Sequence, residues 1–170
     1  IQNSLWPEVL GWFYRIANAE ETQIFKAWFE CTTRSIYHKQ RKDWKAEVRV
    51  VRTENPQSIA GVHAKDLLYL VEEASSLQLP EIYDVIDGAL TSGPDNRLVL
   101  VGNPTANVGR FYEAFHTRTD QFSDLLHWNS EESPIVSESA IAGFREEYGE
   151  ESREYKIRIL GEFAPDESKM

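Results

Sequence analysis

The sequence predicts an α/β fold in which helices flank a parallel sheet. Three observations predict it: an apolar run at residues 67–71, a second at residues 98–101, and between them a helical pattern that residues 92–96 interrupt. Continuous apolar runs of this length are typical of buried strands. A strand, a helix and a second strand within about 35 residues form a βαβ unit, whose right-handed crossover sets the two strands parallel.

Length and composition fit one domain with a hydrophobic core. The chain has 170 residues, of which 41% are hydrophobic, and this is enough to bury a core. No apolar stretch approaches the roughly 18 residues that span a bilayer. The single cysteine, Cys31, excludes an internal disulfide and fits a reducing cytoplasm. Because the chain begins without Met and already inside an amphipathic pattern, we expect it to be a piece of a longer protein.

Before the first apolar run, the sequence predicts one helix and one strand. Apolar residues recur at helical spacing from Ile1 to Ile16, with Ser4 as the expected cap. Residues 22–39 have no clean period and favour no single element. Residues 47–51 alternate basic with apolar side chains, which is typical of a strand.

Beyond the first run, helices are expected from Pro80, from Gly109 and over residues 137–149. A strand is expected around residues 125–128. We expect the aromatic face of the second helix to pack on the sheet, and the last segment, 152–160, to present one apolar face. The following side chains belong to these expected apolar faces or to the core: Trp6, Trp12, Trp28, Phe111, Tyr112, Phe115, Trp128, Tyr155, Ile159 and Leu160.

Charge is spread unevenly along the chain. The net charge of −10 argues against general nucleic-acid binding, but seven basic residues lie between Arg34 and Arg52 against two acidic ones. This cluster is either ordinary solvated surface or a patch that meets phosphate by charge, with Tyr37 and Trp44 able to stack on bases. The candidate DNA-contact residues are Arg34, Lys39, Arg41, Lys42 and Lys45.

Polar residues suited to chemistry follow both apolar runs. Glu72 and Glu73 end the first, and Gly102, Asn103 and Pro104 follow the second. In nucleotide hydrolysis, one carboxylate at a strand end holds Mg²⁺ through water while a second orients the attacking water. Singly, an acidic pair is usually a helix cap and Gly-Asn-Pro a turn. On successive parallel strands, however, the combination is much less often accidental.

Residues 59–163 resemble the ATPase region of tailed-phage terminase large subunits, the motors that package DNA. The resemblance rests on several motifs in one order, at residues 60–63, 67–75, 88–91, 100–105, 109–115, 148–152 and 160–163. It implies a parallel-sheet P-loop NTPase-like domain of the RecA/ASCE type with flanking helices, and it implies ATP and Mg²⁺ as cofactors.

The resemblance also implies residue roles. Glu73 would activate water, and Glu72, where the family usually has Asp, would hold Mg²⁺ through water. Residues 102–104 would sense the γ-phosphate and couple hydrolysis to movement. His63 and Lys65 lie where some motors place a basic residue that acts on a neighbouring subunit.

One family motif is missing. No G-x-x-x-x-G-K-[ST] phosphate loop occurs. In the family this loop lies upstream and a nuclease domain follows. We therefore expect residues 1–170 to be a partial ATPase domain, truncated before its phosphate-binding loop and inactive alone.

For the intact protein, the resemblance implies translocation of double-stranded viral DNA into the procapsid. It also implies partnership with the portal and the terminase small subunit, a homo-oligomeric ring, the host cytoplasm and no membrane. Two alternatives stay open. One is the motor core of another nucleic-acid-dependent ATPase, such as a helicase, and the other is a non-catalytic interaction module derived from such a domain.

Overall fold

The computed structural model of the protein describes residues 5–51 and 55–165. The chain divides into two compact units, Ile1–Ile59 and Ala60–Met170. Each is described by itself.

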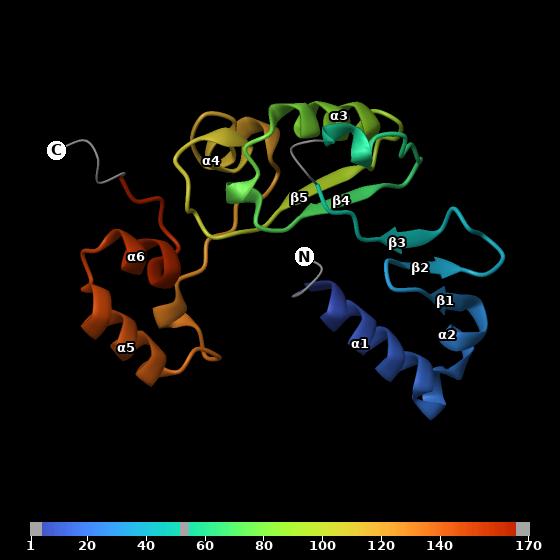
Figure 1. Cartoon of the computed structure of the whole chain (residues 1–170), viewed down its shortest axis with the longest axis horizontal. Helices are drawn as coiled ribbons and strands as arrows, with labels where there is room; N and C mark the ends of the chain where they lie inside the picture. The colour runs from blue at the N-terminus through green and yellow to red at the C-terminus, as the bar shows by residue number, and fades with distance from the viewer. Residues whose placement is uncertain (1–4, 52–54, 166–170) are drawn as a thin grey trace. The chain divides into compact units, whose positions relative to one another are not determined.

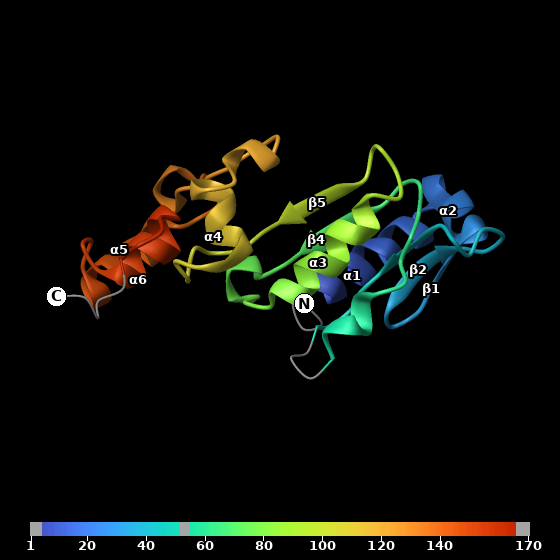
Figure 2. The ribbon, with the colours of Figure 1, turned by 90° about the horizontal axis from the view of Figure 1, so that it is seen from above.

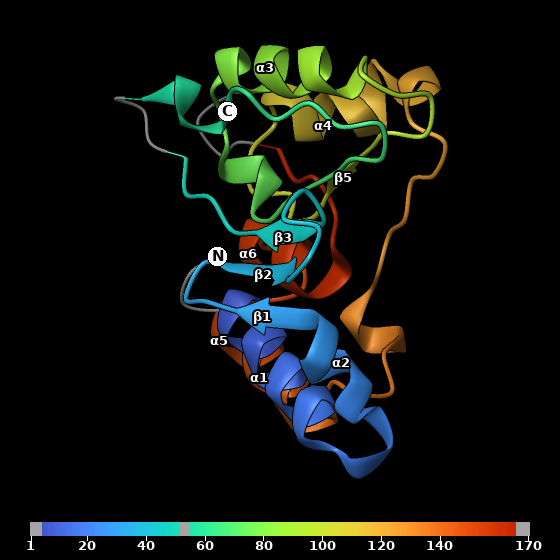
Figure 3. The same ribbon diagram turned by 90° about the vertical axis from the view of Figure 1, so that its right-hand side faces the viewer.

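The first unit contains helices and a three-stranded antiparallel sheet (Figure 3). Its elements are α1 (Leu5–Asn18), η1 (Glu20–Thr22), α2 (Gln23–Trp28), β1 (Phe29–Cys31), β2 (Ser35–His38), β3 (Lys45–Glu47) and η2 (Pro56–Ile59). Helix α1 confirms the predicted first helix, whereas the expected Ser4 cap lies outside the described residues. Strand β2 pairs with β1 on one side and β3 on the other.

Aromatic side chains form the core of this unit. Trp6 and Phe13 of α1 are buried. The Phe25 ring lies 5.4 Å from that of Phe13 and 4.7 Å from that of Phe29, measured between centroids. The indole N–H of Trp6 donates a 2.9 Å hydrogen bond to the carbonyl of Thr33, so the buried tryptophan has a polar partner.

Two predictions for this unit are wrong. The strand expected at 47–51 lies instead at Lys45–Glu47, because the pairing with β2 ends at Glu47. Beyond Glu47, the amide of Val48 donates one more hydrogen bond to the carbonyl of Arg34, at 2.9 Å. Trp12 and Trp28 are not core residues, being 58% and 53% exposed. Trp12 lies beside the apolar stripe of α1, where the Arg15 guanidinium covers its ring at 4.9 Å.

The second unit is built on a βαβ unit. Its elements are β4 (Leu68–Val71), η3 (Ala74–Ser76), α3 (Pro80–Leu90), β5 (Arg97–Leu100), α4 (Gly109–His116), η4 (Thr119–Gln121), η5 (Ser130–Glu132), α5 (Glu138–Tyr148), α6 (Arg153–Tyr155) and η6 (Lys156–Leu160). Strands β4 and β5 are parallel, with register from Leu68↔Arg97 to Val71↔Leu100. The predicted parallel pair is therefore confirmed.

Helix α3 covers one face of the β4–β5 pair (Figures 1 and 2). It buries four side chains: Ile82, Tyr83, Ile86 and Ala89. The opposite face carries Leu68 and Leu70 of β4 beside Val99 and Val101, all at least 40% exposed. Among the described residues of this unit, the strands are thus covered on one face only, although their apolar runs predict burial on both.

The last part of the unit is a small helical body. Ser137 caps α5, its hydroxyl accepting from the amide of Ala140 at 3.3 Å, and the helix ends at Gly149. The core joins Ile141 to Tyr155 and Ile159, with Leu160 packed against them. The expected apolar face of residues 152–160 is confirmed.

The strand expected around residues 125–128 does not form. These residues pair with no described strand, and Trp128, predicted to be core, is 74% exposed. The segment is instead attached through the His127 Nε2 atom, 2.7 Å from the carbonyl oxygen of Leu160. Apolar content alone does not predict a strand correctly here, because a strand also needs the edge of another strand with which to pair.

Helix α4 is confirmed, but its aromatic face does not pack on the sheet as expected. Phe111, Tyr112 and Phe115 surround the Phe163 ring instead, with centroid distances of 5.9, 5.2 and 5.6 Å. The segment that follows η6 is thereby held against α4.

Candidate active site at the carboxyl ends of β4 and β5

The acidic residues lie in a tight turn directly after β4, residues 72–76, which we call the acidic turn. Glu73 has φ 55° and ψ 38°, the left-handed region, and is the one non-glycine residue with positive φ among those described. The amide of Ser76 donates to the Glu73 carbonyl at 2.9 Å and closes the turn. A non-glycine residue held in this conformation costs about 1–3 kcal/mol, and such residues cluster at functional sites.

Gly102 lies against the backbone of this turn. A Cβ atom at Gly102 would stand 3.1 Å from the Ala74 nitrogen and 3.4 Å from the Glu73 Cα. The amide of Ala74 also donates a 2.9 Å hydrogen bond to the carbonyl of Val101. A side chain at this position would therefore be tightly packed against backbone atoms, which would have to shift by a few tenths of an ångström to admit it.

Residues 102–106, which we call the coupling segment, continue from this contact. Pro104 is buried, and the amide of Thr105 donates to the carbonyl of Asn103 at 2.8 Å. The Asn103 and Glu73 side chains are both exposed. The structure therefore brings the predicted residues of β4 and β5 to one edge of the sheet, with an amide and a carboxylate accessible to a ligand.

Glu72 differs from Glu73 in its surroundings. It is partly buried, and its Oε2 atom has no access to solvent. Within residues 5–51 and 55–165, no group of three or more His, Cys, Asp or Glu side chains is placed to hold a metal ion. Mg²⁺ that also binds phosphates typically takes only one or two protein carboxylates, and Glu72 and Glu73 are the residues of this turn that could supply them.

His63 and Lys65 lie at the other end of β4. Both are exposed, and their loop is joined to the 92–96 turn through Ala64, whose carbonyl accepts from the Ser92 hydroxyl at 2.7 Å and from the Asn96 side-chain amide at 3.2 Å. The whole of strand β4 lies between this loop and the acidic turn, and each residue of a strand adds about 3.3 Å to that distance. Within this chain, therefore, the two basic residues do not join Glu72 and Glu73.

The basic cluster of the first unit is split by the β2–β3 hairpin. The hairpin tip, residues 39–44, carries Lys39, Arg41 and Lys42, whereas Arg34 precedes β2 at its other end. The Lys45 ammonium forms a hydrogen-bonded ion pair with the Glu47 carboxylate, with 2.6 Å between Nζ and Oε2. That hydrogen bond is the main cause that lowers the pKa of the Glu47 carboxyl. The five candidate DNA contacts thus do not form one uniform patch.

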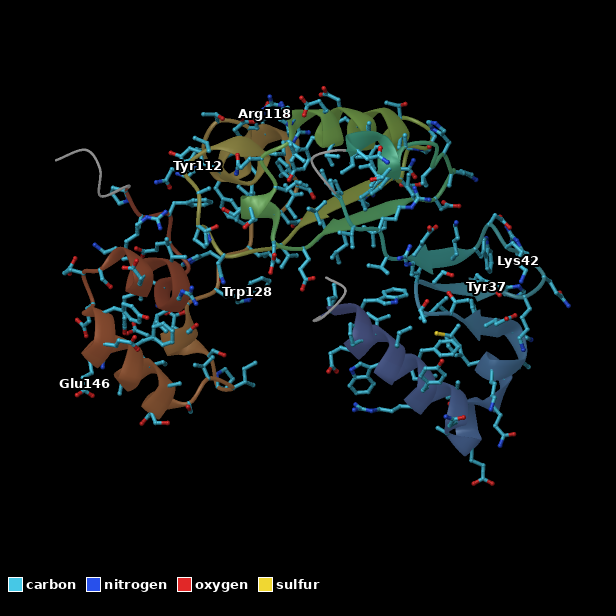
Figure 4. The ribbon with its side chains drawn as sticks, in the orientation of Figure 1. Tyr37, Lys42, Tyr112, Arg118, Trp128 and Glu146 are labelled. Atoms are coloured by element: carbon cyan, nitrogen blue, oxygen red, sulfur yellow. The ribbon has the colours of Figure 1, made fainter. Side chains whose placement is uncertain are left out.

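Aromatic rings contact two of the three cations of the tip. The Arg41 guanidinium lies 3.9 Å from the centre of the Trp44 ring, and the Lys42 ammonium lies 3.9 Å from that of Tyr37 (Figure 4). The His38 Nδ1 atom accepts hydrogen bonds from the amides of Gln40 and Arg41, both at 3.2 Å. The tip is an ordered loop in which positive charge and exposed aromatic surface lie together.

Sequence reasoning missed Ser75, which is 1% exposed and links the acidic turn to the coupling segment. A serine two residues after an acidic pair is indistinguishable in sequence from an ordinary turn residue. The burial of its hydroxyl follows from the approach of a segment 31 residues away, and no local signal indicates it.

The fold and site define an α/β protein with an acidic pair at the carboxyl ends of parallel strands. No protein-family model matches the chain. A probable terminase large subunit of Enterobacteria phage P7 is 35% identical to it over 144 residues, covering 81% of this chain and 27% of that protein. The chain therefore spans about a quarter of the relative's length. The resemblance to terminase large subunits that the sequence motifs indicate is confirmed: the chain is related to a probable terminase large subunit.

No helix among the described residues is both long and apolar enough to cross a lipid bilayer.

Proposed function

We propose that this chain is part of the ATPase motor of a phage DNA-packaging enzyme and that Glu73 activates the water that attacks ATP. One observation carries the proposal: Glu73 is held in a left-handed conformation directly beside Gly102, which follows the neighbouring parallel strand β5. A strained carboxylate-bearing residue at the edge where nucleotides bind in open α/β sheets favours a catalytic role. The similarity to a probable terminase large subunit supports the same class.

Within this proposal Glu72 and Glu73 have different tasks. Glu72, with one buried carboxylate oxygen, would hold Mg²⁺ through water. Mg²⁺ supplies charge neutralisation on the phosphates when bound. Glu73 and Asn103, both exposed, would contact the water and the γ-phosphate.

The test is ATP hydrolysis by the intact protein that carries this chain. We expect Glu73→Gln to lower kcat by at least about 100-fold, the usual contribution of a general base. The matched control is Glu81→Gln, because Glu81 is an exposed acid in the first turn of α3, and it should leave kcat unchanged. Unchanged turnover in the Glu73 variant would remove this residue from the mechanism.

A second measurement separates the two acids. Glu72→Gln should raise the Mg²⁺ concentration that gives half-maximal hydrolysis, whereas Glu73→Gln should stay slow at saturating Mg²⁺. Equal Mg²⁺ dependence of the two variants would contradict the division of roles.

DNA contact is assigned to the hairpin tip. Lys39, Arg41 and Lys42 share it. Arg41 has only a long 3.4 Å ion pair with the exposed Asp43, whereas Lys45 is held closely by Glu47 at 2.6 Å. The remaining partners we propose for the intact protein are the portal and the small subunit, with a ring of copies acting in the host cytoplasm.

Salt dependence tests the DNA contact, because removing one cation that binds a phosphate lowers the slope of log K against log salt by about 1. We expect the double variant Arg41→Ala with Lys42→Ala to lower this slope by about 2 for duplex DNA. The matched control is Lys45→Ala, which should lower it by much less. An unchanged slope in the double variant would exclude the hairpin tip as a DNA contact.

A further inference from the structure

Ser75 is a buried polar residue at the centre of the candidate site. It lies two residues after Glu73, in η3, and is 1% exposed. Among the Ser, Thr, Asn, Gln, His and charged side chains that the structure describes, no other is buried. A hydroxyl in such a position is unfavourable unless it forms hydrogen bonds, so the partners of Ser75 indicate what it does.

Ser75 joins the acidic turn to the chain beyond β5 through two atoms. Its hydroxyl oxygen accepts a 3.0 Å hydrogen bond from the amide of Ala106. Its carbonyl accepts a 2.6 Å hydrogen bond from the side-chain amide of Gln78, which also donates to the carbonyl of Val108 at 3.1 Å. Both contacts of Ser75 therefore lead to residues 106–108.

These contacts enclose Asn103. Immediately before the coupling segment, the carbonyl of Val101 accepts a hydrogen bond from the amide of Ala74. At the other end of the segment, the amide of Ala106 donates to the hydroxyl of Ser75. On the acidic turn, the two partners are Ala74 and Ser75, the two residues that follow Glu73. Asn103 thus lies in a short loop whose two ends are held by the turn that presents the carboxylate.

The coupling segment is also attached to the helical body. The guanidinium of Arg153, in α6, donates a 2.7 Å hydrogen bond to the carbonyl of Thr105. Just beyond the coupling segment, the side-chain amide of Asn107 donates to the carbonyl of Ala164, in the stretch that follows η6, at 2.7 Å. The coupling segment is therefore hydrogen-bonded to two elements at once, to the acidic turn through Ser75 and to α6 through Arg153.

We propose that Ser75 is a positioning residue that fixes Asn103 relative to Glu73 and so connects the chemistry at the acidic turn to the coupling segment. The inference rests on the proposed function, because it assigns Ser75 a task in ATP hydrolysis. Without the hydroxyl, the Ala106 end of the loop is released while the Val101 end stays attached. Asn103 then moves independently of Glu73.

The test compares Ser75→Ala with Ser76→Ala. Ser76 is the next residue of the same turn, is exposed, and its hydroxyl forms no hydrogen bond to a described residue. Exchange of the Ala106 amide hydrogen is measured in the full chain, and kcat and KM for ATP in the intact protein. If Ser75→Ala fails to fold, Ser75→Cys replaces it, because a thiol has a similar shape and accepts hydrogen bonds weakly.

We expect Ser75→Ala to speed exchange at Ala106 by about tenfold and to lower kcat by about tenfold, the effect of removing one hydrogen bond, with KM unchanged. Ser76→Ala should change neither. Unchanged exchange at Ala106 would overturn the proposal, as would faster exchange with unchanged kcat, or a change confined to KM. If the unmodified intact protein does not hydrolyse ATP, the proposed function itself fails, and this outcome is distinct because the exchange measurement does not depend on activity.

Discussion

The backbone of Gly102 is packed against the backbone of Glu73, so that a Cβ atom on the glycine would stand 3.4 Å from the Glu73 Cα. The two residues are 29 positions apart, and each lies two residues beyond the end of a strand, Glu73 after β4 and Gly102 after β5. The turn that carries the proposed catalytic carboxylate is therefore packed against the segment that follows β5.

Gly102→Ala should disturb this contact. The new methyl group meets backbone atoms of Glu73 and Ala74, which yield less readily than a side chain, and we expect a loss of about 1 kcal/mol or more in unfolding free energy. The control is Gly88→Ala in α3, where a Cβ meets nothing within 4 Å and where alanine favours the helix. Urea denaturation of both variants checks this. A Gly102 variant as stable as the Gly88 variant would contradict the close packing.

Glu73→Gly and Glu73→Ala should separate the backbone of this residue from its side chain. Both changes remove the carboxylate, but only glycine adopts φ 55° without strain. After allowance for the greater freedom of glycine in the unfolded chain, the Gly variant should be more stable than the Ala variant by about 1 kcal/mol. Chemical denaturation measures the difference. Equal stability would mean that the left-handed conformation carries no strain.

Tyr83→Phe and Tyr155→Phe each delete one buried hydroxyl, with opposite expected effects. The Tyr83 hydroxyl has no hydrogen-bond partner among the described residues, and burial raises its pKa to about 12. The Tyr155 hydroxyl donates to Glu131 at 2.6 Å and accepts from Arg145 at 3.2 Å. Tyr83→Phe should therefore be neutral or stabilise by up to about 1 kcal/mol, and Tyr155→Phe should destabilise. Thermal unfolding of both variants checks the direction of each change in stability. Destabilisation by Tyr83→Phe would contradict the expectation for Tyr83.

Acid should weaken the helical body through Glu131. The hydrogen bond from Tyr155 is the main cause that lowers the pKa of the Glu131 carboxyl from its usual 4.5. A lowered pKa in the folded state means that the ionised carboxylate stabilises the fold above pH 4.5, and this contribution is lost as the pH falls through the folded-state pKa.

Unfolding midpoints at pH 6 and pH 3 check this expectation. Glu131→Gln should lose less stability between the two pH values than the unmodified chain. Glu146→Gln, which changes an exposed acid of α5 (Figure 4), should lose as much as the unmodified chain. Identical pH dependence of all three would remove Glu131 as a source of acid sensitivity.

The parts of the fold that are predictable from sequence have strong local signals. Helix α5 lies between a capping serine and a terminating glycine, and α3 begins at Pro80. The parallel pairing of β4 and β5 follows from the length of the connection between two apolar runs. The proximity of the acidic turn to Gly102 follows in turn, because parallel strands end at the same edge of a sheet.

The parts that were not predictable depend on contacts between distant segments. Whether Trp12 or Trp128 is buried depends on the surface that each meets, and no pattern in the neighbouring residues records this. The same holds for Phe163, which the aromatic face of α4 encloses, and for the Ser75 hydroxyl. Whether Glu73 acts on ATP stays a prediction.

The side of β4 and β5 that α3 leaves uncovered has its own consequence. Leu70 stands opposite Val99 on that side, and neighbouring positions are also aliphatic and open to water. Contiguous apolar surface attracts further apolar surface. Concentrated samples of the isolated chain are therefore expected to self-associate through this side, and preparations should stay monodisperse only when they are dilute or when this side is occupied.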